Sequence, residues 1–190
     1  MDLANAGACQ TILNLADEDF ISVLAVDSSP HAIVDMSRIG PNRDQMLRSV
    51  SRIQSMGGGI FVGEGLRAGW AELQKTQAGT RHLILFSDAD DSEEPDDYKT
   101  TLSEMTRAGA TVSVIALGTE KSQDADLLKE IAELGQGRIF FCDRPGDIPD
   151  IFTQETISVA RAAFLEEQTP LHGTAGWNQI AAAQPDWPRT

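Results

Sequence analysis

The chain has 190 residues, of which 41% are hydrophobic and 23% charged, a balance that argues against disorder and suits one globular domain. Its net charge of −14 and its sequence pI of about 4.4 produce a surface that repels phosphate backbones and anionic lipid heads. We therefore expect no nucleic-acid partner and no direct membrane contact by this chain, and we expect cations or basic protein patches instead.

The number of cysteines and the lengths of the apolar runs argue against two further classes, disulfide-rich proteins and membrane-spanning proteins. Two cysteines, Cys9 and Cys142, are too few for a disulfide framework or a metal knuckle, and we expect both to be buried. No segment approaches the roughly 18 consecutive apolar residues of a membrane-spanning helix. The polypeptide as written is predicted to be soluble, while its compartment stays open.

Strands and helices are expected to alternate along most of the chain, because apolar residues recur first at strand and then at helix spacing. The expected helices cover residues 2–17, 41–53, 63–73, 95–105, 127–134 and 148–165, and the expected strands cover residues 20–26, 31–36, 82–87, 111–117 and 138–142. This alternation predicts an α/β fold: a Rossmann-like, doubly wound and mostly parallel sheet with helices on both faces.

The ends of the chain differ from this pattern. After residue 165 prolines and glycines interrupt it, so residues 1–165 are predicted to form the domain and residues 166–190 a C-terminal tail or linker. The chain opens in a helix, whereas a doubly wound domain normally opens with a central strand. We therefore expect a first strand to be missing from this polypeptide.

The strand at 82–87 runs directly into an acidic segment, in which seven of the ten residues from Asp88 to Asp97 are acidic. The carboxyl ends of parallel strands form the binding crevice of such sheets, and a carboxylate there is a place for a hard cation. Asp88 is therefore a candidate metal ligand. The alternative is that Asp88 caps the next helix and that the rest is a solvated loop.

The order of these segments resembles the von Willebrand factor type A (VWA) domain over roughly residues 1–163. The similar segments are Val23-Leu24-Ala25-Val26-Asp27, Gly57-Gly58-Gly59-Ile60 with Gly63-Glu64-Gly65-Leu66, the strand from Leu83 to Asp88, the strand from Thr111 to Gly118, and residues 127–141. The first three resemble the family's second strand, its Gly-Gly-Thr loop with the following helix, and its strand ending in Thr-Asp-Gly. The last two resemble its strand ending in Gly and the final helix and strand of its domain.

The resemblance implies a metal-ion-dependent adhesion site, which in that family takes its ligands from three loops. Only Asp88 matches it, because Ile60 stands at the threonine position and has no oxygen. The nearest string to the family's Asp-x-Ser-x-Ser is Asp27-Ser28-Ser29-Pro30-His31, which lies on a different strand. The site is therefore predicted to be degenerate. No cofactor is assigned, and any Mg²⁺ or Ca²⁺ is expected to bind weakly.

The resemblance also predicts a fragment of a longer, bacterial-type protein that was cut after its first strand. Family members of this type often sit in larger, membrane-anchored polypeptides. A lost central strand would expose the backbone edges of two others, so we expect a homo-oligomer formed by strand pairing or strand exchange.

Two functions are consistent with these residues. The leading one is a non-enzymatic module that binds a protein partner through the loops at the strand ends. Its candidate ligand-binding residues are Asp27, Ser29, Gly59, Ile60, Ser87, Asp88 and Asp90. The alternative is a metal-dependent phosphatase or sugar-nucleotide transferase that uses Asp88 and Asp90 as an Asp-x-Asp site.

Overall fold

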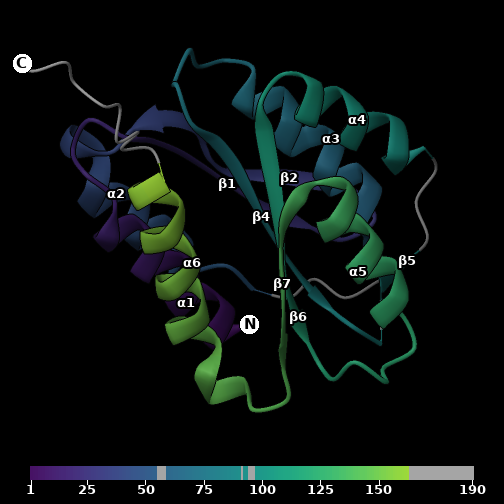
Figure 1. The fold of residues 1–190 in the computed structure, drawn as a ribbon. Coiled ribbons are helices and arrows are strands. Elements are labelled where there is room, and N and C mark those ends of the chain that lie inside the picture. The colour runs from purple at the N-terminus through teal and green to yellow at the C-terminus, as the bar shows by residue number, and fades with distance from the viewer. Residues whose placement is uncertain (55–58, 91, 94–96, 163–190) are drawn as a thin grey trace, which may run out of the picture.

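A computed structural model describes residues 1–54, 59–90, 92–93 and 97–162, and it places them in alternating helices and strands (Figure 1). Gly57, Gly58 and the tail at 166–190 lie outside these residues. The helices are α1 (Asp2–Asn14), α2 (Arg43–Val50), α3 (Val62–Leu73), α4 (Tyr98–Arg107), α5 (Ala125–Leu134) and α6 (Ile148–Ala162). The strands are β1 (Phe20–Val26), β2 (Pro30–Arg38), β3 (Ile60–Phe61), β4 (Arg81–Asp88), β5 (Ser92–Glu93), β6 (Ala110–Leu117) and β7 (Gln136–Cys142).

The strands form separate sheets where the sequence predicts a single one. β1 pairs with β2 in antiparallel fashion, and β4, β6 and β7 form a parallel sheet with β6 at its centre. A short parallel pair, β3 with β5, stands apart. The predicted α/β class is confirmed, and the described sheet is divided between β1 and β4.

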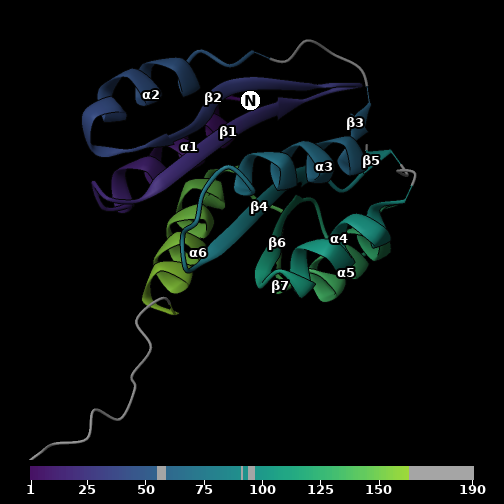
Figure 2. The ribbon, with the colours of Figure 1, turned by 90° about the horizontal axis from the view of Figure 1, so that it is seen from above.

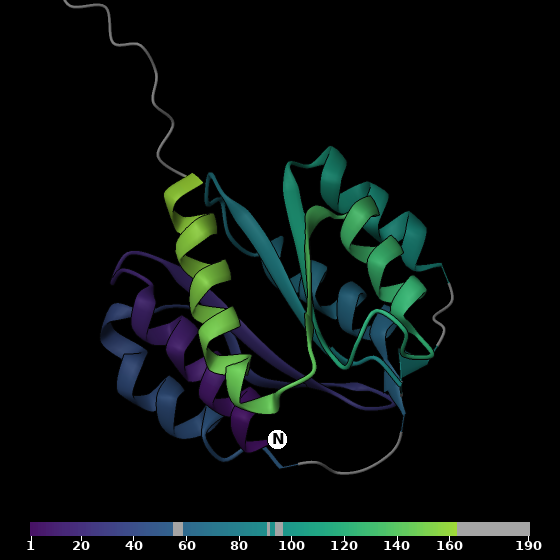
Figure 3. The ribbon, with the colours of Figure 1, turned by 60° about the horizontal axis from the view of Figure 1, so that its bottom comes forward.

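The helices cover the two sheets in layers. Helices α3, α4 and α5 lie on one face of the β4–β6–β7 sheet, and α6 lies on the other face beside α1 (Figures 1 and 3). The buried core is divided in the same way as the sheet. One cluster joins α3, α4 and α5 to the parallel sheet, a second joins α1, α2, β1 and β2, and a third lies between the parallel sheet and α6.

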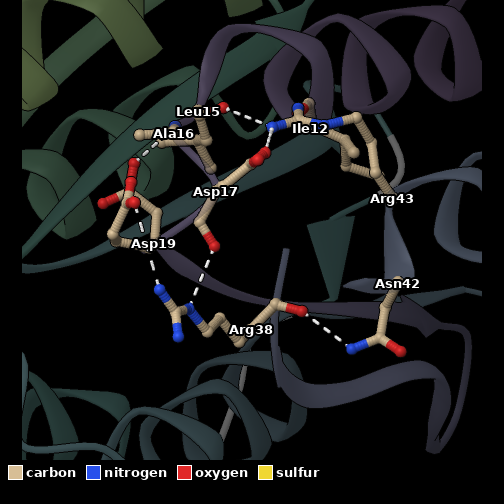
Figure 4. A network of polar contacts seen from close by, with 9 residues as sticks. Ile12, Leu15, Ala16, Asp17, Asp19, Arg38, Asn42 and Arg43 are labelled. Atoms are coloured by element: carbon tan, nitrogen blue, oxygen red, sulfur yellow. Dashed lines mark hydrogen bonds and ion pairs between the residues drawn. The ribbon is translucent and has the colours of Figure 1, made fainter. Parts of the chain in front are cut away.

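A set of hydrogen bonds ties the end of α1 and the loop after it to β2 and α2 (Figure 4). The Arg43 guanidinium donates to the backbone carbonyl oxygens of Ile12 and Leu15 and to the Asp17 carboxylate, the last at 2.8 Å. Arg38 Nε donates to the Asp17 carbonyl oxygen at 3.1 Å. Arg43 thereby satisfies carbonyl groups at the end of α1 that have no partner inside the helix. These contacts make α1, β1, β2 and α2 one structural half.

A buried carboxylate links α6 to the parallel sheet. Glu155 is 1% exposed, and its Oε1 accepts a hydrogen bond from Ser113 Oγ at 2.7 Å. His82 Nε2 lies 3.3 Å from the same oxygen, and Arg138 Nη2 lies 2.6 Å from Oε2. One side chain of α6 thus contacts β4, β6 and β7. Burial alone would raise the pKa of Glu155, but the contacts with His82, Ser113 and Arg138 together lower it.

Candidate functional site

The loops at the carboxyl ends of β1, β4 and β6 meet at one corner of the molecule. The Asp27 carbonyl oxygen, just after β1, accepts a hydrogen bond from the Phe61 amide of β3 at 3.2 Å. Ile60 of β3 pairs with Ser92 of β5, which follows β4 in the chain. The short β3–β5 pair therefore joins the end of β1 to the end of β4 (Figure 2). The structure brings together the strand ends that carry the predicted ligand-binding residues.

Asp27 and Ser29 shape the turn between β1 and β2. The Ser29 amide donates to Asp27 Oδ1 at 2.9 Å, and His31 Nε2 lies 3.3 Å from each carboxylate oxygen. The backbone hydrogen bond from Ser29 is the main reason that the pKa of Asp27 is lowered, and His31 acts in the same direction. The Asp27 carboxylate is therefore engaged in local contacts.

Asp88 and Asp90 organise the loop that follows β4. Asp88 Oδ1 accepts a hydrogen bond from the Asp90 amide at 3.1 Å, which closes the first turn of the loop. Asp90 reaches the loop after β6, where its carboxylate accepts from the Gln123 amide at 2.8 Å and from Ser122 Oγ at 3.2 Å. The N-cap residue of the next helix, α4, is Asp97, so Asp88 does not cap that helix.

Two serines complete the same loop. Ser87 Oγ and Ser92 Oγ lie 2.7 Å apart in a buried position, and Ser92 Oγ donates to the Asp88 carbonyl oxygen at 2.7 Å. The Ser92 amide donates to Asp124 Oδ2 at 2.9 Å, and the Asp124 amide donates to the Ala89 carbonyl oxygen at 2.7 Å. The buried polar groups of this corner are thus paired with one another, which fixes the loop positions.

Gly59 and Ile60 precede α3 at the same corner. Ile60 is partly buried, and its side chain packs against the core cluster that α3, α4 and α5 share. An apolar side chain that joins the core offers nothing to a cation. The Ile60 side chain therefore contributes to the packing of the core.

A shallow hollow beside this corner contains residues that the sequence analysis missed. It has a volume of about 650 Å³ and is lined by Ser92, Tyr98, Gln123, Asp124, Asp126, Leu127 and Glu130. Lys99 Nζ lies 2.6 Å from a Glu130 carboxylate oxygen, and the Tyr98 hydroxyl donates to the other. The available signal was the pair of acidic residues Asp124 and Asp126 at the start of α5, after the loop that follows the apolar strand β6.

The described residues of this corner do not gather the oxygen ligands that a divalent cation takes. Mg²⁺ and Ca²⁺ need about six or more oxygen ligands, several of them from protein. Within the described residues no group of three or more His, Cys, Asp or Glu side chains is placed to hold a metal ion. Asp88 and Asp90 accept loop hydrogen bonds, and Ile60 has no oxygen to add.

The sequence profile of the von Willebrand factor type A domain matches residues 10–154. This chain belongs to that family. The resemblance on which the sequence analysis relied is thereby confirmed, together with its α/β fold. A comparison with curated proteins finds no match.

Several solved structures share this fold at low sequence identity. A von Willebrand factor type A protein from Catenulispora acidiphila has a TM-score of 0.68 at 17% identity, over 81% of this chain and 37% of that one. A conserved hypothetical protein from Bacteroides thetaiotaomicron has a TM-score of 0.62 at 16% identity, over 83% of this chain and 87% of that one. A pilus adhesin of Lactobacillus rhamnosus GG has a TM-score of 0.65 at 10% identity, over 84% of this chain and 28% of that one.

The coverage of the relatives and the lengths of the helices are two further findings. This VWA chain spans 37% of the length of the Catenulispora acidiphila protein, so that protein's whole activity is not transferred. Within the part of the chain that the structure describes, the helices are too short or too polar to cross a bilayer.

The missing ligands lead to a prediction about metals. Titration calorimetry with Mg²⁺, Ca²⁺ or Mn²⁺ is expected to detect no binding tighter than about millimolar, the weak end of the range for calcium sites. The reason is that Asp88 stands without oxygen donors from Ile60 or from a serine motif. A micromolar, one-to-one isotherm that Asp88→Ala abolishes would contradict this prediction.

Proposed function

We propose that this VWA domain is a non-enzymatic module that binds a protein partner through the loops at the carboxyl ends of β1, β4 and β6. The observation that carries the proposal is the hydrogen-bond network of this corner, in which Asp90 and Asp124 tie the β4 and β6 loops together. Loops held in fixed positions on a rigid sheet are a common basis for recognition surfaces.

The charge of the corner supports a basic partner surface. Asp88 and Asp90 lie in the β4 loop, and Asp124, Asp126 and Glu130 line the adjacent hollow. The whole chain carries −14 net charges, which adds long-range attraction for a basic patch. The use of Asp88 and Asp90 as loop-forming acceptors supports binding over turnover, because a metal-dependent phosphate site needs these carboxylates for its cation.

Site-specific cross-linking tests this proposal. A photo-reactive amino acid at Gln123, which is exposed at the corner, is expected to capture a partner from an extract of the cells that produce the protein. Gln77, exposed before the start of β4 at the opposite end of the sheet, is the matched control position and is expected to capture nothing specific. Equal capture at Gln77 and Gln123 would overturn the proposal.

A charge reversal adds a second criterion. The Asp126 side chain is 99% exposed, so Asp126→Lys is expected to leave the fold intact and to weaken capture at Gln123 by about tenfold. Glu18→Lys makes the same charge change in the loop before β1 and is expected to leave capture unchanged. Capture that Asp126→Lys leaves unchanged would argue against an acidic recognition surface.

A further inference from the structure

A second hollow lies at the amino end of β4, at the opposite end of the sheet from the loops of the proposed function. Its volume is about 540 Å³, within the usual range for small-molecule sites. The lining comes from the last turn of α3, the segment between α3 and β4, the first residue of β4 and the residue after α4. It includes Trp70, Gln74, Thr76, Gln77, Arg81 and Ala108.

The charge of this hollow is opposite to that of the whole chain. Arg81 is the one ionisable residue among the described residues that line it, whereas three carboxylates line the hollow beside the proposed binding loops. The contacts of Arg81 within the described part of the chain include no carboxylate. Its positive charge is therefore available to an anionic ligand.

Two contacts hold the Arg81 guanidinium in place. One of its N–H groups donates to the Ala108 carbonyl oxygen at the end of α4, and its Cζ lies 5.4 Å from the centroid of the Trp70 ring, a cation–π contact. A guanidinium has five N–H donors, so most of them remain for another acceptor. Because the group is already positioned in the free protein, it loses little freedom when an anion binds.

Trp70 adds a donor that the fold itself leaves unused. The residue is 7% exposed, and its indole Nε1 is buried without a hydrogen-bond partner among residues that the structure describes. The indole N–H can only donate, and buried donors in native structures are rarely left unpaired. Gln74 and Gln77 line the same hollow with exposed side chains, which can move to admit a ligand atom. A ligand acceptor in the hollow would satisfy this N–H.

The remaining polar side chains of the lining also favour an acceptor. Thr76 Oγ1 accepts a hydrogen bond from the Ala78 amide at 3.2 Å, which leaves its hydroxyl hydrogen to donate. The exposed amides of Gln74 and Gln77 can each turn an NH2 group toward a ligand. The hollow thus offers several donors and one positive charge, which is the chemistry that binds an oxyanion.

We propose that this hollow binds a small organic carboxylate, whose charged group pairs with Arg81 and one of whose oxygens accepts from Trp70 Nε1. The flat fork of a guanidinium matches the two oxygens of a carboxylate. One negative charge balances the single arginine, whereas a phosphate dianion would bring a second charge to a chain of −14. The same net charge repels an acidic protein surface more strongly than a small monoanion.

Benzoate is a suitable probe, and benzamide is its uncharged control with nearly the same shape. The full chain is titrated with each at neutral pH and followed by nuclear magnetic resonance. Benzoate is expected to bind at one site with a Kd of about a millimolar, in keeping with its small size. The indole N–H resonance of Trp70 and the backbone amides of residues 74–81 are expected to shift. Benzamide is expected to leave these resonances in place.

A pair of charge-removing variants tests the role of Arg81. Arg81→Gln is expected to weaken benzoate binding by at least roughly tenfold, because a hydrogen-bonded charge is lost. Arg107→Gln makes the same charge change on the exposed last residue of α4, next to Ala108 and outside the lining. It is expected to change the Kd by less than about twofold. Equal weakening by the two variants would overturn the proposal, because benzoate would then respond only to overall charge.

Three further results would also overturn the proposal. They are equal binding of benzoate and benzamide, tighter binding of phenyl phosphate than of benzoate, and an unshifted Trp70 indole N–H on saturation with benzoate. If Arg81→Gln does not fold, the comparison of benzoate with benzamide on the unmodified chain decides. The hollow lies apart from the loops of the proposed function, so either proposal can fail alone. Gln77 stays a valid control for protein capture, because the ligand proposed here is a small molecule.

Discussion

Replacing Glu155 by alanine is expected to lower the free energy of unfolding by about 3 kcal/mol, the low end of what breaking a buried ion pair costs. The Glu155 side chain is buried among Ser113, His82 and Arg138, and its loss leaves their polar groups without an acceptor. Arg138 is half exposed and can regain water, which is why the low end of the range applies. Urea unfolding followed by circular dichroism measures the change.

The same helix offers a matched control. Gln154 is the neighbour of Glu155 and is exposed, so Gln154→Ala is expected to change the free energy of unfolding by less than about 0.5 kcal/mol. Equal destabilisation by the two substitutions would mean that the loss comes from the helix and not from the buried carboxylate.

A fall in pH is expected to remove part of the stability that the Glu155 carboxylate contributes. The folded-state pKa of Glu155 lies below its unfolded value, so the carboxylate stabilises the protein above the unfolded pKa of about 4.3. That stability is lost as the pH falls through the folded pKa. The advantage of the unmodified chain over Glu155→Gln is therefore expected to be constant near neutral pH and to shrink below about pH 4. An advantage that grows on acidification would contradict the lowered pKa.

Gly137→Ala is expected to destabilise the protein by about 3 kcal/mol, as overpacking against a fixed backbone does. A Cβ at this position would lie 2.5 Å from the Val112 carbonyl carbon and closer still to its oxygen. The β6–β7 pairing is irregular there, between the pairs Val112–Gln136 and Val114–Ile139. The added Cβ would meet backbone atoms of β6, so relieving the clash requires β6 or β7 to shift and weakens their pairing. Thermal unfolding measures the resulting loss of stability.

Gly146 is the control for this substitution. A Cβ at Gly146 would meet nothing within 4 Å, so Gly146→Ala is expected to leave stability nearly unchanged or to raise it slightly by restricting the unfolded chain. If Gly137→Ala melts at the same temperature as Gly146→Ala, then β7 does not approach β6 as closely at Gly137 as described.

Periodicity predicted most of the elements, because their apolar faces are defined by local sequence. The predicted strand at 20–26 coincides with β1, and the predicted strands at 82–87 and 111–117 lie within one residue of β4 and β6 at each end. The edge strand is longer than predicted, since β2 includes the polar residues Ser37 and Arg38, whose pairing partners in β1 are not visible in the local pattern.

The strand ends that form the corner were predicted from the sequence, whereas the contacts between its loops were not; that this corner is a binding site stays a prediction. Strand ends are local features, so Asp27 and Asp88 could be placed at the correct corner from sequence. Contacts between loops far apart in the chain could not: Asp124 binds the Ser92 amide 32 residues away, and Asp90 reaches Gln123 over a similar separation. At short range the signal was sufficient: Gly135 is the C-cap residue of α5, and the next residue, Gln136, has the left-handed backbone, with φ 54°. The domain boundary at residue 165 stays a prediction.

The division of the sheet between β1 and β4 favours stepwise unfolding of the protein. The α1–β1–β2–α2 half has a hydrophobic cluster of its own, and it joins the rest mainly through the α1–α6 contact, α3 and the β3–β5 pair. Melting of that half would leave the core of β4, β6 and β7 buried beneath α4 and α5. The free energy of such partial unfolding is lower than that of global unfolding, and the segment that unfolds is a cooperative unit, or foldon. We therefore expect the substructure of β4, β6 and β7 to persist after the amino-terminal half has unfolded.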